Sequence, residues 1–504
     1  MQRISNYKDL KNKKDRIFYR ALEILPGALS WGTLLAVVLL SWQKPLWIAL
    51  FIIVFDIYWL IKIIYLSTHL LISYKRFKKN LSLNWQKKYQ AFQNWQKIYH
   101  LIILPFYREG LGVLESTFRA LAASSYPLEK MIIILAVEER GGSLSLKNAR
   151  IIRQKYSHLF YKFLITRHPG NIPGEIAGKG SNEAWAGKQA KKLIDKLKIP
   201  YKNIICSVFD IDTCVHRKYF ACLTYNFLKQ PNPHNCSFQP IAMYHNNFWD
   251  SPALMRVIAF SNSFWQMMEQ ERPKKLCTFS SHSMSFKTIV DIGFWQKNIV
   301  SEDSRIFFQC LFHFKGDYKV VPLFMPVYMD TVLADKYLIS IQNQYKQQRR
   351  WAWGCENVPW VLYHSFKTKG MGFWLRSRHC FEQLEGFYSW ATAAILVFVL
   401  GWLPLALGGD AFNRTVLAFN LPKLTSYIMT LAMLGMFVSA GVSMLLLPKK
   451  PAKYKKHKYA FMLLQWLLLP ITTIFFGSIP ALEAQTRLML GKYMGFFVTS
   501  KVRR

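Results

Sequence analysis

The stretch Ile204-Ile205-Cys206-Ser207-Val208-Phe209-Asp210-Ile211-Asp212 decides the fold of this chain, because a short apolar run ends directly in two carboxylates. A run of this length bounded by polar residues predicts a buried parallel strand. Two more such runs, 101–104 and 131–137, precede it, and helix-like stretches cover 111–124 and 181–196. Strands that alternate with helices indicate an α/β domain with a mostly parallel sheet.

Polar residues follow each of these strands at its carboxyl end: 105–109, Glu138-Glu139 and Asp210 to Asp212. Ligands of such sheets bind beyond the carboxyl ends of the strands, so we expect these segments to line one crevice. Side chains two apart on a strand share a face, so Asp210 and Asp212 can reach one hard cation. Mg²⁺ and Mn²⁺ favour carboxylate and phosphate oxygens, which predicts a metal site here, although the same pattern also caps ordinary turns.

Two segments further along the chain add acidic, cationic and aromatic groups. Ser301-Glu302-Asp303 precedes a helix-like run, and acids are common in the first turn of a helix because of its dipole. A carboxylate there can also act as a general base on a sugar hydroxyl. In Gln347-Gln348-Arg349-Arg350-Trp351, Arg350 offers charge-assisted contacts to phosphate, and Trp351 offers an apolar face for a sugar ring. The alternative to a binding role is that this segment is an ordinary helix end, with its basic side chains in solvent and its tryptophans packed in the core.

Long apolar runs flank the polar middle of the chain. Two precede it and three follow it, at 24–42, 46–66, 387–407, 425–447 and 461–482. Each has about the 20 residues that a membrane-spanning helix needs. The last run contains Pro470, Gly477 and Pro480, and a basic tail follows it, so we expect a broken or re-entrant segment with the tail inside.

The charge of the chain indicates membrane topology. The formal net charge is +38, from 66 Lys and Arg against 28 Asp and Glu, which first calls to mind a nucleic-acid-binding protein. The basic residues, however, gather beside the apolar runs, at 8–20, 75–97 and 449–458. This is the positive-inside pattern, so we predict no nucleic-acid partner and place these segments in the cytoplasm, close to membrane lipids.

These patterns divide the chain into five parts. A basic segment and a two-helix membrane hairpin cover 1–72, and a basic interfacial segment covers 73–100. A cytosolic α/β domain follows at 101–358, then an interfacial helix at 359–386. The membrane helices at 387–504 complete a multi-pass protein of the plasma membrane with its catalytic domain in the cytoplasm.

The order D-x-D, E-D, Q-x-x-R-W resembles that of family 2 inverting glycosyltransferases of the processive type, such as cellulose, chitin and hyaluronan synthases. The segment 105–109 is similar to the family's P-x-Y-N-E, with Arg108 in place of Asn, and 178–182 is similar to its G-K-x-x-N. The resemblance covers about 101–353. It implies a nucleotide-diphospho-sugar transferase fold, and Glu138 stands near the position where the family usually has an aspartate.

The resemblance also implies roles for individual residues. Asp303 would be the catalytic base, and Asp210 and Asp212 would hold Mg²⁺ or Mn²⁺. Trp351 and Glu302 would bind the acceptor. The nucleotide-sugar would be bound by Tyr107, Glu109, Glu138, Lys179, Asp210, Gln347 and Arg350.

The function expected from this pattern is transfer of a sugar from a nucleotide-diphospho-sugar, with UDP as the expected nucleotide, to a hydroxyl of a growing polysaccharide. One alternative is a non-processive enzyme that glycosylates a membrane lipid. A non-catalytic membrane scaffold with a decayed transferase domain is another, which the intact motif acids disfavour. The donor sugar, the linkage and the oligomeric state stay open.

Overall fold

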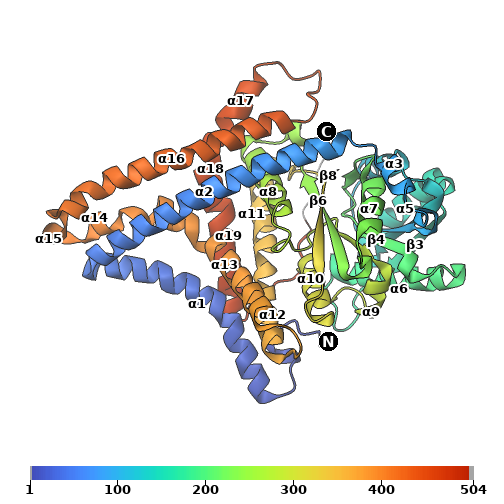
Figure 1. Ribbon diagram of the computed structural model, residues 1–504, viewed down its shortest axis with the longest axis horizontal. Coiled ribbons are helices and arrows are strands. Elements are labelled where there is room, and N and C mark those ends of the chain that lie inside the picture. Colours follow the sequence, from blue (N-terminus) through green and yellow to red (C-terminus); the bar gives the residue numbers. More distant parts are fainter. Residues whose placement is uncertain (1–2, 499–504) are drawn as a thin grey trace.

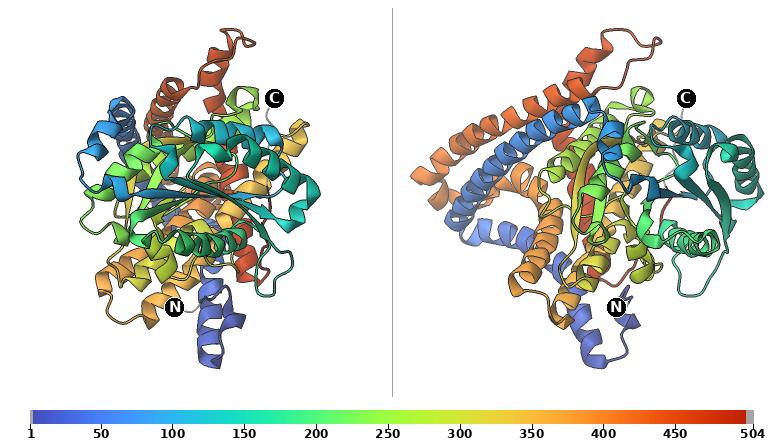
Figure 2. Two further views of the ribbon diagram at one scale, coloured as in Figure 1. Left: turned by 90° about the vertical axis from the view of Figure 1, so that its right-hand side faces the viewer. Right: turned by 45° about the vertical axis from the view of Figure 1, so that its right-hand side comes forward.

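The computed structural model describes residues 3–498 and shows a globular α/β domain from which long helices project (Figure 1). The projecting helices are α1 (Lys13–Gln43), α2 (Pro45–Ser82) and α16 (Val416–Leu446), and α2 and α16 run side by side. The right-hand view of Figure 2 also shows the sheet at the opposite end of the molecule from the tips of α2 and α16. Of the basic tail, Lys501, Arg503 and Arg504 lie outside the described residues.

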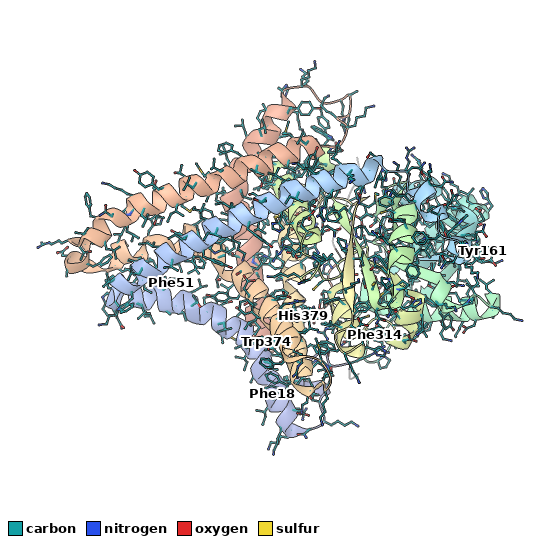
Figure 3. The ribbon with its side chains drawn as sticks, viewed as in Figure 1. Phe18, Phe51, Tyr161, Phe314, Trp374 and His379 are labelled. Atoms are coloured by element: carbon teal, nitrogen blue, oxygen red, sulfur yellow. The ribbon has the colours of Figure 1, made fainter. Side chains whose placement is uncertain are left out.

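Within residues 3–498, four helices are long and apolar enough to cross a membrane. Three are α1, α2 and α16, and the fourth, Lys458–Met489, is built from shorter pieces. A fifth candidate is α13 (Phe373–Phe398) with the segment Leu400–Leu407, which bends by 50°. Their surfaces are apolar: Trp47 is 68% exposed, and Figure 3 shows Phe51 on these helices, far from Tyr161 in the globular domain. These helices match the five predicted apolar runs.

The sheet has eight strands in the order β3-β2-β1-β4-β7-β6-β8-β5. Its strands are β1 (Tyr99–Phe106), β2 (Met131–Glu138), β3 (Lys162–His168), β4 (Ile204–Val208), β5 (Cys214–Val215), β6 (Cys236–Met243), β7 (Ser283–Ser285) and β8 (Lys319–Tyr328). The strands β3, β2, β1 and β4 are parallel neighbours, whereas β7 is antiparallel to both β4 and β6. Strands β6 and β8 are also parallel neighbours, and β5 is antiparallel to β8. The sheet is therefore mixed, but most of its paired residues lie in parallel pairs, as predicted.

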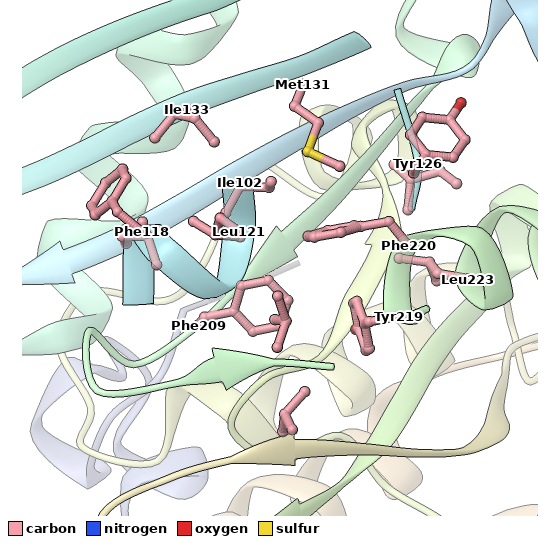
Figure 4. Packing of buried hydrophobic residues seen from close by; sticks show 14 of the residues in the cluster. Ile102, Phe118, Leu121, Tyr126, Met131, Ile133, Phe209, Tyr219, Phe220 and Leu223 are labelled. Carbon is pink, nitrogen blue, oxygen red and sulfur yellow. The ribbon is translucent and has the colours of Figure 1, made fainter. Parts of the chain in front are cut away.

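Helices cover both faces of the sheet. They are α4 (Leu111–Ala122), α5 (Gly142–Tyr156), α6 (Lys179–Leu197), α7 (Tyr219–Lys229), α8 (Ala253–Gln270), α9 (Phe286–Asp291), α10 (Glu302–His313), α11 (Tyr337–Ala352) and α12 (Asn357–Lys367). Figure 4 shows part of one core, where Phe118 of α4 and Phe220 of α7 pack with Ile102 and Ile133 of the strands. Each such buried side chain stabilises the fold by roughly 1.5–3 kcal/mol, which fixes the carboxyl ends of the strands in place.

Two element boundaries differ from the sequence-based division. Helix α2 continues to Ser82, and Trp85 and Tyr89 of α3 (Trp85–Gln90) are buried in the core of the globular domain. The range 73–100 is thus shared between a long helix and the domain. Similarly, the range 359–386 is divided between α12, where Trp360 is buried, and the first half of α13. Aromatic residues in a basic stretch suit a membrane surface and a domain core equally well, so composition alone did not separate them.

Candidate active site

Lys179, the first residue of α6, stands at the centre of the candidate site. Its ammonium donates to both carboxylate oxygens of Asp303, at 2.9 and 2.7 Å, and lies 3.0 Å from Oδ1 of Asp210. Glu183 and Glu302 lie 3.5 and 4.0 Å from the same nitrogen. Burial disfavours the charge of this lysine, but Asp210 and Asp303 outweigh burial and raise its pKa. One buried cation therefore joins the D-x-D and E-D motifs.

Glu302 and Glu183 are the most deeply buried carboxyl groups around Lys179, at 2% and 0% exposed. Burial, and then the charge of Asp303, raises the pKa of Glu302 to about 8. Burial also raises the pKa of Glu183, whose two oxygens have no hydrogen-bond partner among residues 3–498. Carboxylate oxygens of Glu183, Glu302 and Asp303 lie within 4.8 Å of one another, a spacing that suits a cation, and the Lys179 ammonium stands beside them. Lysine and bound protons together limit the negative charge of this cluster.

Asp210 and Asp212 lie in the turn after β4, which ends at Val208. Strand alternation therefore does not orient them as the sequence-based argument assumed. Asp210 accepts a hydrogen bond from Oγ of Ser280 at 2.9 Å, and Asp212 accepts one from the backbone N–H of Asp330 at 3.0 Å. The Asp210 side chain is 30% exposed, so it is accessible to a ligand. Two carboxylates at the carboxyl end of a central strand are a donor set that fits Mg²⁺ or Mn²⁺.

A short loop before β7 holds Asp303 from the other side. Thr278 donates to the backbone carbonyl of Asp303 at 2.6 Å. Nδ1 of His282 donates to the carbonyl of Phe279 at 3.0 Å and lies 3.6 Å from Oδ1 of Asp303. Burial lowers the pKa of His282, so its ring is neutral at pH 7. Between them, Ser281 has φ +70°, a left-handed conformation that is uncommon outside glycine and is typical of functional loops.

The predicted nucleoside end of the crevice is rich in arginine. The guanidinium carbons of Arg108 and Arg140 lie 4.9 and 5.4 Å from the centre of the Tyr107 ring. Glu109 accepts hydrogen bonds from the backbone N–H groups of Tyr107 and Arg108, at 2.9 and 3.1 Å. Glu138 pairs with Arg140, although burial raises the pKa of Glu138. Tyr107, Glu109 and Glu138 therefore form one group.

Helix α11 brings its motif residues to a small pocket and to the C-terminal segment. Gln347 and Trp351 line this pocket together with Tyr244, whose ring centre is 6.3 Å from that of Trp351. The guanidinium carbon of Arg350 lies 4.7 Å from the ring centre of Phe496. Phe496 also packs on Gly178, where an added Cβ would lie 2.6 Å from the Cβ of Phe496. Glycine at 178 therefore permits the close approach of the C-terminal segment to the start of α6.

The sequence matches the family described as glycosyl transferase family group 2 over residues 206–479, which is more than half of the chain. The chain belongs to this family. Its matched region begins in β4 and includes both acidic motifs and α11. No curated protein matches the sequence.

Two solved structures resemble this family group 2 member in the arrangement of their elements. A mannosyltransferase from Pyrobaculum calidifontis, in complex with GDP-Man and Mn²⁺, has 13% sequence identity and a TM-score of 0.41, covering 77% of this chain and 99% of its own. TarS 1–349 from S. aureus, in complex with UDP-GlcNAc, has 10% identity and a TM-score of 0.37, covering 79% and 93%. The family match and the mixed sheet together give this glycosyl transferase a GT-A-like α/β fold flanked by apolar helices.

The structure brings together many of the site residues predicted for this glycosyl transferase. Lys179, Asp210, Glu302 and Asp303 form one cluster, whereas Gln347 and Trp351 line a separate pocket. Among the described residues, the group around Tyr107 makes no hydrogen bond or ion pair with the Lys179 cluster. The two are linked only electrostatically, because the charge of Asp212 contributes to raising the pKa of Glu109. The sequence reasoning missed Glu183, Thr278 and Phe496. Of these, only Glu183 carried a signal, because it lies four residues after Lys179 on one helix.

Proposed function

We propose that this glycosyl transferase is membrane-bound and moves a sugar, with inversion, from a nucleotide-diphospho-sugar, specifically a UDP-sugar, to a hydroxyl of a growing polysaccharide. The observation that carries the proposal is the Lys179 ammonium between Asp303 and Asp210. It keeps a candidate base and a candidate diphosphate ligand within the reach of one side chain. Inversion in a single displacement needs a base on one side of the anomeric carbon and a stabilised leaving group on the other.

Asp303 would act as the base that removes the acceptor hydroxyl proton as the hydroxyl attacks. Its carboxylate is 22% exposed, so a substrate hydroxyl has access to it. Lys179 and Arg350 would place positive charge where the leaving diphosphate develops negative charge. Trp351 would offer a face for the acceptor sugar and Glu302, directly before the base, would complete the acceptor end.

Asp210 and Asp212 would hold the divalent cation. When bound there, Mg²⁺ or Mn²⁺ supplies charge neutralisation of the diphosphate. Tyr107, Glu109 and Glu138 would form the nucleoside end, with Gln347 toward the diphosphate. The basic segments beside the apolar helices support a plasma-membrane location with the transferase domain in the cytoplasm.

The test is a screen of nucleotide-sugars with the purified protein in detergent, with product sizes read on a gel. We expect one UDP-sugar to give a polymer in the presence of Mg²⁺ or Mn²⁺. EDTA should abolish transfer, and added metal should restore it. A lipid-sized product would show that the acceptor is a membrane lipid and not a growing polysaccharide. If every nucleotide-sugar fails with Mg²⁺ and Mn²⁺ in a correctly folded preparation, the transferase proposal is wrong.

A further inference from the structure

A cavity of about 390 Å³ lies on the back of α11, on the side away from the pocket that Gln347 and Trp351 line. Its walls are Ile341, Tyr345, Lys346 and Arg349 of α11, together with Phe475 and Ile479 of the last apolar run. Residues 341, 345 and 349 are four apart and share one face of the helix, whereas Gln344 and Gln347 lie toward the active site. The cavity is therefore separate from the candidate active site.

An exposed apolar stripe leads along the last run to this cavity. Leu463, Leu467, Ile471 and Phe475 follow one another at intervals of four and are 47%, 66%, 47% and 54% exposed. They come from α17 (Lys458–Leu464), the 3-10 turn η11 (Gln465–Leu468), α18 (Leu469–Thr473) and the following turn. Their shared exposure gives an apolar surface, here called the track, along this run. The track ends at η12 (Ile474–Ser478), a π-helical turn of the kind that is frequent at functional sites.

Lys346 and Arg349 line the cavity, and further charged side chains adjoin it through Arg349. Glu483 accepts hydrogen bonds from Tyr345 and Arg349, at 2.8 and 2.6 Å, and from Arg487 at 2.8 Å. Lys346 lines the cavity beside them and contacts the ring of Phe497, at 5.2 Å from its centre. Three cations face one anion here, a net of two positive charges next to an apolar cavity.

We propose that this cavity binds an anionic membrane lipid. One hydrocarbon chain would follow the track from Leu463 to Phe475 into the cavity, and the phosphate of the headgroup would meet Lys346 and Arg487. A lipid satisfies both features of the site, because a chain needs apolar walls and an anionic headgroup is attracted by nearby lysine and arginine. The inference rests on the proposed membrane location and not on the proposed transfer chemistry.

The position of the site gives the lipid a role beyond anchoring. Helix α11 carries Gln347 and Arg350 toward the active site and Lys346 and Arg349 toward the cavity. A lipid in the cavity would pack against the back of the helix that presents the diphosphate-binding residues. The lipid site and the active site would thus share one rigid element.

The experiment uses the full-length protein in phosphatidylcholine nanodiscs with a photoactivatable phosphatidylglycerol that carries a diazirine on its acyl chain. Cross-linked peptides are mapped by mass spectrometry. We expect labelling of the segment that contains Phe475 and Ile479. The variant Lys346→Gln should reduce that labelling roughly fivefold, in line with the contribution of one lysine near an anionic membrane surface. The matched control is Lys336→Gln, an exposed lysine at the start of the same helix and outside the cavity.

The outcomes separate the site from the membrane location. If α2 and α16 are labelled but the cavity segment is not, the lipid site is wrong and the membrane location stands. If no apolar helix is labelled, the membrane location itself fails. Equal labelling by a phosphatidylcholine analogue, together with no effect of Lys346→Gln, would overturn the assignment of an anionic lipid. If the segment stays unlabelled by lipid and a bifunctional lysine-reactive reagent joins Lys346 of two copies of the chain, the face is a self-association surface instead.

Discussion

Around Lys179, four carboxyl groups surround one buried ammonium, whereas around Tyr107 two exposed guanidinium groups flank one ring. Lys179, Glu183 and Glu302 of the first group are buried, so their charges depend on their neighbours for compensation. The guanidinium groups of the second group meet solvent, where water screens their charges. Substitutions at the Lys179 end should therefore have large, coupled effects, and those at the Tyr107 end should have small, independent ones.

The proposed function places the chemical step at the Lys179 end and nucleotide binding at the Tyr107 end, and the two environments fit these proposed roles. At the Lys179 end, the pKa of Glu302 is raised to about 8 by burial and then by Asp303, so protons and charges respond to one another. At the Tyr107 end, backbone N–H groups hold Glu109, and side chains are oriented mainly by stacking. A proton-transfer step needs the first environment, and recognition of a planar base needs only the second.

The largest effect is expected for Asp303→Asn. An amide cannot take the acceptor proton, so transfer should fall by about 10²–10⁴-fold, the usual contribution of a general base. Nucleotide binding should be kept, because the D-x-D residues are unchanged. Turnover assays and calorimetric titration of UDP measure the two effects. The control is Asp291→Asn, in an exposed pair with Lys287, and full activity of Asp303→Asn would remove this residue from the mechanism.

The next effect is on stability, for Lys179→Met. Removal of the ammonium leaves buried carboxylates without their cation, which should cost about 3–5 kcal/mol of unfolding free energy. The double variant with Asp303→Asn should recover part of the loss, because one of the uncompensated charges is removed as well. Thermal unfolding in detergent measures both. The control on the same helix is Lys191→Met, which breaks an exposed pair with Asp195 and should cost about 0.5 kcal/mol at most. Equal losses for the two lysine variants would contradict the central place of Lys179.

The contrast also explains how far the sequence could predict the site. The runs 101–104, 131–137 and 204–209 predicted β1, β2 and β4, because every residue of these runs is apolar or small. The two-residue β5 and three-residue β7 carry no such pattern, and β7 makes the sheet mixed. The pairing of Lys179 with Asp303 joins positions 124 residues apart, so only the folded chain brings them together.

Phe496 is a second residue whose place at the site could not be predicted from the sequence. It reaches Arg350 and Gly178 only because the last apolar run turns the C-terminal segment back to the active site. By contrast, Tyr107 and Glu109 could be placed from the sequence, because they directly follow a strand whose end is fixed by its neighbours. A residue that directly follows a strand can be placed from the sequence alone. Contacts between segments far apart in the chain depend on packing, which composition does not predict.

A pH series on Glu302→Gln tests the claim that the Lys179 end holds a proton. The pKa of this carboxyl rises from its ordinary 4.5 to about 8 in the folded protein. The stability that its protonated form gives is complete below pH 4.5 and is lost as the pH rises through 8. The variant mimics the protonated form, so its melting temperature relative to the wild type should increase from pH 5 to pH 9. The control is Glu115→Gln, because the hydrogen bond from Lys155 lowers the pKa of Glu115. A constant difference between Glu302→Gln and the wild type across this range would show that Glu302 is ionised throughout.

The smallest effect is expected at the other end, for Arg108→Asn, which places asparagine where the resembling family has it. The guanidinium of Arg108 stacks on the exposed side of Tyr107, and such contacts contribute about 0.5–1 kcal/mol. The KM for the nucleotide-sugar should therefore rise about two- to fivefold, while kcat and the melting temperature stay unchanged, because Arg140 still holds the ring. Steady-state kinetics measure the split, with Arg150→Asn on the exposed side of α5 as the matched control. A loss of kcat in Arg108→Asn as large as that of Asp303→Asn would break the division, because it would place the Tyr107 end in the chemical step.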